Sequence, residues 1–136
     1  MSPYRELEHT ADWALQVWAP TREELFTEAA QGMYALLRAR RPEQASRAAF
    51  RVVELSAHDY ESLLVAWLQE LLYDTDTEGR VFSEFHIQAL TPTYLRAEAA
   101  GLAGGQVEVV IKAVTYHNLN IHPTPEGFEV TIVFDV

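Results

Sequence analysis

The sequence contains no cysteine and a single lysine, and its 20 acidic residues outnumber its 10 basic residues, which gives a formal net charge of -10 at pH 7. Without cysteine, the chain cannot form disulfides, thiolate zinc sites or a thiol nucleophile. The negative field repels phosphate backbones at long range. We therefore expect no direct nucleic-acid binding, and we expect cations or basic protein surfaces as partners.

Long apolar runs are also missing. The first residues, MSPYRELEHT, have no apolar signal core, and no stretch approaches the roughly 20 apolar residues of a membrane helix. We expect a cytoplasmic protein without a membrane contact. Its 136 residues are 49% hydrophobic, which is enough for a core, and they include no repeat or low-complexity linker, so one domain spanning residues 1–136 is predicted.

Two segments carry helix signals. Thr21 and Glu24 form a capping box before apolar residues that keep helical spacing up to Leu36, and we expect residues 38–41, rich in arginine, to close this helix before Pro42. A second helix is predicted after Asp59, which can act as its N-cap. Its apolar face is made of Leu64, Trp67, Leu68 and Leu71.

The second helix leads into the acidic stretch DTDTEG at residues 74–79. This stretch resembles the start of an EF-hand loop, but the position that needs a terminal glutamate holds Phe85. We interpret it as the polar exit of the helix. The aromatic residues Phe26, Trp67 and Tyr73 are expected in the core.

Alternating hydrophobicity predicts strands over the rest of the chain. They are expected at residues 4–7, 12–18, 49–55, 81–89, 94–102, 106–114, 119–121 and 128–136. Turns are expected at Thr91-Pro92, at Gly104-Gly105 as a hairpin, and at residues 125–127. The resulting fold class is α+β, with two helices packed on a largely antiparallel β-sheet.

The last residues, TIVFDV, place a carboxylate beside the chain end. Alternation puts Phe134 and Val136 on one face and Asp135 on the other, so the α-carboxylate of Val136 is expected to be held near the Asp135 side chain. Two such anions either share a proton or recruit a cation, and oxygen ligands favour calcium, magnesium or manganese. A solvated edge strand that merely ends in Asp-Val is the alternative. Asp12 also lies on the polar face of its strand, opposite Trp13, and supplies a third carboxylate.

Four motifs of this chain resemble those of the archease family. They are EHTADW at residues 8–13, DTEG at 76–79, KAVTYHNL at 112–119 and a terminal FDV at 134–136. Their order and spacing match the family from His9 to Val136. One departure is Asn118, where the family ordinarily has an aspartate.

Archeases are accessory proteins of the RtcB-type RNA ligase of tRNA splicing and RNA repair. The resemblance implies a protein that is not itself an enzyme, and that promotes guanylylation and multiple turnover of the ligase and broadens its nucleotide use. It also implies a divalent cation, calcium or alternatively magnesium or manganese, held by Asp12, Asp135 and Val136.

Lys112 is the only lysine among ten basic residues, which suggests a need for a compact ammonium group rather than a planar guanidinium. We expect it on the polar face of its strand, where it balances the acidic cluster or contacts a nucleotide phosphate or the ligase. His9, Thr10 and His117 are candidates for hydrogen bonds to the metal-binding carboxylates, with a structural role as the alternative for each.

Two other functions remain open from the sequence. A small metal-dependent hydrolase or phosphotransferase would use the carboxylates and Lys112 on a phosphate. A calcium-stabilised, chaperone-like module would use the cation for stability alone.

Overall fold

The computed structural model describes residues 3–8, 12–42 and 47–136. The elements in chain order are β1 (Tyr4–Glu8), β2 (Asp12–Ala19), α1 (Arg22–Leu36), β3 (Ala48–Ser56), α2 (Tyr60–Glu78), β4 (Arg80–Thr91), β5 (Tyr94–Ala103), β6 (Ala113–Val114), β7 (His122–Thr124) and β8 (Gly127–Asp135). All pairings between these strands are antiparallel. The predicted α+β class is confirmed.

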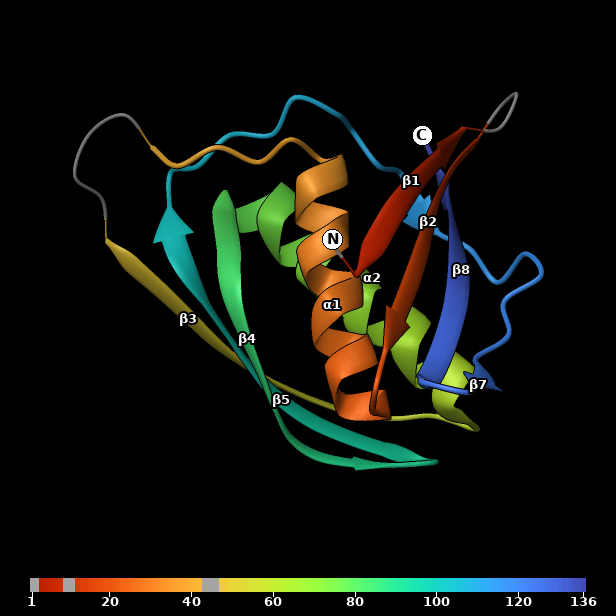
Figure 1. Ribbon diagram of the computed structural model, residues 1–136. Coiled ribbons are helices and arrows are strands. Elements are labelled where there is room, and N and C mark those ends of the chain that lie inside the picture. The colour runs from red at the N-terminus through yellow and green to blue at the C-terminus, as the bar shows by residue number, and fades with distance from the viewer. Residues whose placement is uncertain (1–2, 9–11, 43–46) are drawn as a thin grey trace.

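The strands form two sheets with the two helices between them (Figure 1). One sheet has five strands in the order β1-β2-β8-β6, with β7 also paired to β8, and the other has the order β3-β5-β4. Helix α1 packs against β2 on one side and β4 on the other. The largest fully buried side chains of this common core include Phe26, Trp67, Phe82 and Phe134.

Helix α1 begins as the sequence predicts and ends earlier. The Thr21 hydroxyl accepts a hydrogen bond from the Glu24 amide at 3.1 Å, which confirms the N-cap. The last helical residue is Leu36, and Arg38 already has a left-handed backbone with φ of 53°. Arg40 then forms a β-bridge with Gln106, so the arginine segment leaves the helix to pair with another part of the chain.

Helix α2 is capped at both ends. The Asp59 carboxylate accepts from the Ser62 amide at 2.8 Å, and Gly79 ends the helix with φ of 66°, a conformation that glycine adopts without steric cost. The DTDTEG stretch therefore is the end of the helix, as interpreted. The expected core position of Tyr73 is wrong, because this residue points away from the buried stripe and its exposure is 62%.

The predicted strand at 106–114 is wrong except for Ala113 and Val114, and so is the expected hairpin at Gly104-Gly105. Here the chain crosses from the three-stranded sheet to the five-stranded one. On the way, the amides of Glu108 and Val109 donate to the Leu37 carbonyl at 2.9 and 3.1 Å. The crossing segment therefore supplies hydrogen-bond donors to a free carbonyl at the end of α1 and does not pair with a neighbouring strand. The short strand expected at 119–121 lies instead at His122–Thr124.

A buried carboxylate joins α2 to the three-stranded sheet. Asp74 is 2% exposed and accepts hydrogen bonds from both Arg51 of β3, at 3.2 Å, and Arg80 of β4, at 2.7 Å. Beside it, the Thr75 hydroxyl donates to the Arg80 carbonyl at 2.8 Å and meets the Tyr34 hydroxyl of α1 at 2.7 Å. Burial raises the pKa of Tyr34, so its hydroxyl stays protonated and can donate. This cluster ties both helices to β3 and β4.

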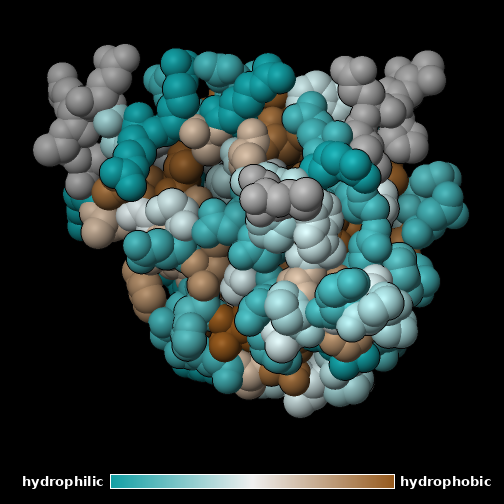
Figure 2. Space-filling model, in the orientation of Figure 1, coloured by the Kyte–Doolittle hydropathy of each residue, from teal (hydrophilic) through white to brown (hydrophobic). Residues whose placement is uncertain are grey.

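The surface is predominantly polar on the face drawn in Figure 2, where hydrophobic areas are small and separated by hydrophilic residues. Neither helix of the described residues is long and apolar enough to cross a membrane.

Removal of the Asp74 carboxylate should destabilise the fold. Asp74→Ala removes a buried carboxylate and leaves Arg80 without its ion pair, and breaking a buried pair typically costs roughly 3–5 kcal/mol of unfolding free energy. Arg51 keeps its ion pair with Glu70 at 2.6 Å. Because the Arg51 and Arg80 side chains are 26% and 30% exposed and retain access to water, we expect the lower end of this range.

Urea unfolding of the wild type and the variant measures this loss. Glu54→Ala is the matched control, because Glu54 pairs with Arg96 on the surface at 3.8 Å and such exposed pairs contribute about 0–1 kcal/mol. Equal losses in the two variants would show that Asp74 has no special role in stability.

Candidate functional site

Asp12 and Asp135 are direct partners across neighbouring strands. Asp12 is the first residue of β2, Asp135 is the last residue of β8, and the two face each other in the antiparallel register. Directly opposite residues have Cα atoms about 4.5–5.5 Å apart and side chains on the same face of the sheet. The structure thus brings together two carboxylates that are more than a hundred residues apart in the sequence.

The pairing of β2 with β8 continues along both strands, from Asp12 and Asp135 to Ala19 opposite Phe128. It is held by apolar residues on the inner face, where Leu15, Val17 and Ile132 are buried. The two aspartates alternate with these residues and so belong to the outer face, away from α1. As Figure 1 shows, the C-terminal end of the chain lies beside the start of β2. Val136 follows Asp135 directly, which places its α-carboxylate at this end of the sheet.

Lys112 reaches the same place through its backbone. Its amide donates to the Asp135 carbonyl at 2.7 Å, and the next residue, Ala113, pairs with Asp135 in β6. The predicted strand position of Lys112 is wrong, since β6 begins only at Ala113. Lys112 is nevertheless exposed, as expected, between the buried Ile111 and the half-buried Ala113. The ammonium group forms no ion pair with the described residues, and it is therefore available to a ligand.

The motif that follows Lys112 forms a turn beside the end of β8. The Thr115 amide and hydroxyl both donate to the Val133 carbonyl, at 3.0 and 2.9 Å, which holds this turn against the strand. His117 is exposed, its amide donates to the Thr115 hydroxyl at 3.3 Å, and its ring lies 3.4 Å from the Asn118 amide group. A hydrogen bond from His117 to a carboxylate of the site stays a prediction.

Asn118 has a left-handed backbone with φ of 50°. Asparagine and aspartate tolerate this conformation better than most residues do. Asparagine can therefore occupy this turn position as an aspartate would. Only the charge of the side chain differs.

His9 and Thr10 lie outside the described residues, just before β2. Their predicted hydrogen bonds to the carboxylates are thus neither supported nor opposed by the structure.

The donor set at this end of the sheet consists of oxygen atoms. Within the part of the chain that the structure describes, no group of three or more histidine, aspartate or glutamate side chains could hold a metal ion. A cation at the Asp12–Asp135 pair therefore needs further oxygen ligands, and the terminal carboxylate after Asp135 is the nearest in the sequence. Two or three carboxylates without nitrogen or sulfur fit calcium, magnesium or manganese better than zinc.

The sequence interpretation missed two groups of residues. One is the buried cluster around Asp74, although a signal for it was present: Asp74 continues the helical spacing of Trp67 and Leu71, so an acid falls on the buried stripe of α2. The other is a cavity beside Trp18, whose lining comes from segments that are distant in the sequence.

Comparisons with known proteins agree on the family. The family model described as "Archease protein family" matches residues 4–136. The chain is 36% identical to protein archease of Methanosarcina barkeri, covering 98% of this chain and 95% of that one, and 34% identical to protein archease of Methanopyrus kandleri, covering 88% and 89%.

Two solved structures are similar to this one. Protein 1598 of Methanobacterium thermoautotrophicum has a TM-score of 0.76, 28% identity and full coverage of both chains. A protein of Thermotoga maritima, described as "an archease, possible chaperone", has a TM-score of 0.65 with 97% and 96% coverage, and at 18% identity it supports the fold alone. The matching family model, the curated relatives above 30% identity and the shared fold show that this chain belongs to the archease family.

Proposed function

We propose that this protein is an accessory activator of an RtcB-type RNA ligase, which binds a divalent cation at Asp12, Asp135 and Val136. The observation that carries the proposal is the cross-strand pair of Asp12 and Asp135 at the end of β2 and β8, with Lys112 bound to the same strand end. Membership of the archease family supports the choice of partner. The protein acts in the cytoplasm, promotes ligase guanylylation and multiple turnover, and broadens nucleotide use.

The paired aspartates have a physical reason to bind a cation. Like charges placed directly opposite each other on a sheet are destabilising, and no ion pair within the described residues offsets this repulsion. A divalent cation would remove it and would supply positive charge for an anionic group of the ligase or its nucleotide. Calcium is the proposed ion, because flexible sets of carboxylate oxygens suit it, with magnesium and manganese as alternatives.

Lys112 is proposed to act on the partner. Its side chain is exposed, and its backbone amide is bound to the Asp135 carbonyl next to the paired aspartates. It can contact a nucleotide phosphate or a carboxylate of the ligase. The net charge of -10 disfavours direct contact with RNA, so the ligase itself is the proposed binding partner.

A metal-dependent hydrolase or phosphotransferase is the function to be tested against this one. The purified protein is incubated with RNA, nucleotides and a divalent metal, with and without the ligase. An activator yields product only when the ligase is present. Turnover of RNA or nucleotide by the protein alone would assign it the enzymatic function.

The first prediction from the proposed function concerns the paired aspartates. Asp12→Asn and Asp135→Asn should weaken calcium binding on the order of tenfold or more, since ligand charge sets affinity at oxygen sites. The same variants should stabilise the metal-free protein by about 0.5 kcal/mol, because they remove a like-charge pair. Calorimetric titration and urea unfolding measure the two effects.

Asp76→Asn is the control, because Asp76 is an exposed acid near the end of α2. It makes the same change in net charge at a different place. Calcium affinity lowered equally by all three variants would mean that the protein attracts calcium through its overall charge and not through this pair.

The second prediction separates activation from cation binding. Lys112→Ala should keep calcium affinity and lose stimulation of ligase guanylylation, and Lys112→Arg should restore little of it, because a guanidinium differs in shape from an ammonium. Guanylylation assays with calcium titrations on the same samples test this. Full stimulation by Lys112→Ala would leave Lys112 without a role on the ligase.

The third prediction tests the terminal carboxylate. A short Gly-Ser extension after Val136 replaces an anionic oxygen with a neutral carbonyl, which should weaken calcium binding and ligase stimulation together. An N-terminal extension of the same length is the control. If both extended proteins bind calcium and stimulate the ligase equally, Val136 does not supply a ligand.

A further inference from the structure

The outer face of the five-stranded sheet carries a second group of residues at the end opposite the paired aspartates. Trp18 faces Glu129 across β2 and β8, and Glu129 in turn faces His122 of β7. Trp18, Glu129 and His122 thus form a row across β2, β8 and β7. The Trp18 amide donates to the Pro3 carbonyl at 2.9 Å, which places Pro3, just before β1, next to this row. Trp18 and Asp12 are six residues apart on one strand, so both side chains lie on the outer face.

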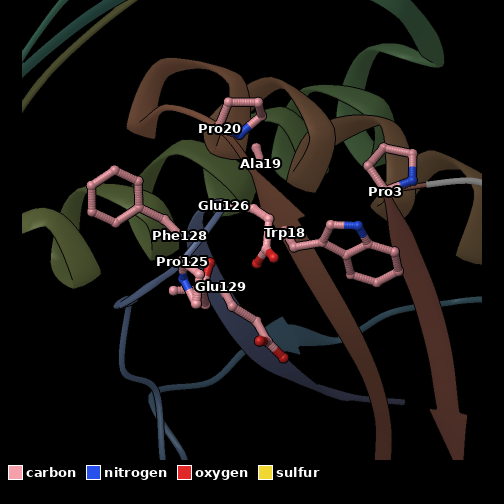
Figure 3. Close-up of a pocket in the computed structure, with 9 residues that line it drawn as sticks. Pro3, Trp18, Ala19, Pro20, Pro125, Glu126, Phe128 and Glu129 are labelled. Atoms are coloured by element: carbon pink, nitrogen blue, oxygen red, sulfur yellow. The ribbon is translucent and has the colours of Figure 1, made fainter.

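Beside this row lies a cavity of about 630 Å³. Its lining includes the aromatic residues Trp18 and Phe128, the prolines Pro3 and Pro20, and the acids Glu126 and Glu129. Figure 3 draws the lining residues, with Glu126 from just before β8, Glu129 from β8 and Trp18 from β2. The volume falls within the roughly 300–1,000 Å³ typical of ligand sites.

Among the described residues that line this cavity, the charged ones are Glu126 and Glu129, and none is lysine or arginine. Glu129 is held in place, because one of its oxygens accepts a hydrogen bond from Gln16 and the other lies 3.8 Å from the His122 ring. Glu126 is exposed, on the turn between β7 and β8, and its carboxylate has no hydrogen bond or ion pair with the described residues. One carboxylate of the cavity is therefore positioned and the other is free.

Two arginines of the described residues contact the lining of the cavity or the strand beside it. Arg22 lies between the rings of Tyr60 and Phe128, with its guanidinium carbon 4.4 Å from each ring centre. Arg5 donates to the side-chain oxygen of Gln16. Among the described residues no cation lies over the Trp18 indole and its N–H has no acceptor, and the side chain is half-buried at the cavity.

We propose that this cavity binds an arginine or lysine side chain presented by an extended, proline-rich segment of a partner protein. The cation would lie against the indole of Trp18, where cation–π attraction adds to that of the two carboxylates. The indole N–H would donate to a backbone carbonyl of the segment, and the proline rings of the cavity would pack against apolar residues next to the cation. Extended proline-rich segments bind aromatic-lined grooves in this way because they are already ordered.

This site is separate from the proposed cation site. The strand between Asp12 and Ala19 spans roughly 23 Å at about 3.3 Å per residue, so the two sites occupy opposite ends of the same face. Binding at Trp18 uses neither the paired aspartates nor a metal. It does not depend on the proposed function.

The test uses the full chain and a synthetic peptide of prolines around one central arginine, with a second peptide carrying glutamine in its place. The indole N–H signals of Trp13, Trp18 and Trp67 are followed by NMR during titration and are assigned with Trp→Phe variants. We expect a saturable shift of the Trp18 signal with the arginine peptide, little change of the other two, and binding of the glutamine peptide weaker by about tenfold.

Glu126→Gln should weaken binding of the arginine peptide by about three- to fivefold, because one carboxylate of the cavity is lost. Glu126 is exposed, so this variant is expected to fold. Glu78→Gln is the matched control, since it removes the same charge from an exposed position that does not line the cavity. Asp12→Asn should bind the peptide as the wild type does, which keeps this test distinct from that of the cation site.

Three results would overturn the proposal. The first is a Trp18 signal that does not move, or that moves equally with the glutamine peptide. The second is equal weakening of peptide binding by Glu126→Gln and Glu78→Gln, which would mean that the overall charge of the protein attracts the peptide and the cavity does not. The third is a Trp18 signal that shifts with protein concentration alone, which would assign the cavity to a second copy of this chain.

Discussion

The antiparallel pairing of β2 with β8 is the constraint on which the functional surface depends. It joins Asp12 to Asp135 at one end and Ala19 to Phe128 at the other. Its inner face is buried against α1 and the rest of the core, so a shift of the register by one residue would move apolar side chains such as Leu15 and Ile132 into water. The packing of the inner face therefore determines which residues meet on the outer face.

The acids of this protein occur in two different environments. Asp74 is buried and accepts hydrogen bonds from two guanidinium groups, so its charge is compensated within the fold and it stabilises the packing of α2 on the three-stranded sheet. Asp12 and Asp135 face each other and have no such partner among the described residues. A carboxylate that the fold leaves uncompensated is the kind of group expected to bind an external cation.

The outer face of the five-stranded sheet would then contact partners at two places. At the end near Asp135, the proposed site offers carboxylate oxygens for a cation and an exposed lysine for an anionic group of a partner. At the opposite end, Trp18 and two carboxylates suit a positively charged side chain. Both helices lie behind this sheet, against its other face (Figure 1). The two sites thus differ in chemistry while sharing one rigid support.

The sequence alone determined the elements whose signals are local. Thr21 and Asp59 mark the starts of both helices, because a cap needs only a side chain and an amide three residues later. Strand alternation also placed Asp12 and Asp135 on polar faces. The segment after Gly104 was misjudged, because its alternation reflects contact with the end of α1 and not with a neighbouring strand. Only the tertiary structure decided that Asp12 faces Asp135, that Asp74 meets two arginines, and that Trp18 borders a cavity, since each depends on strand register or packing between residues far apart in the chain.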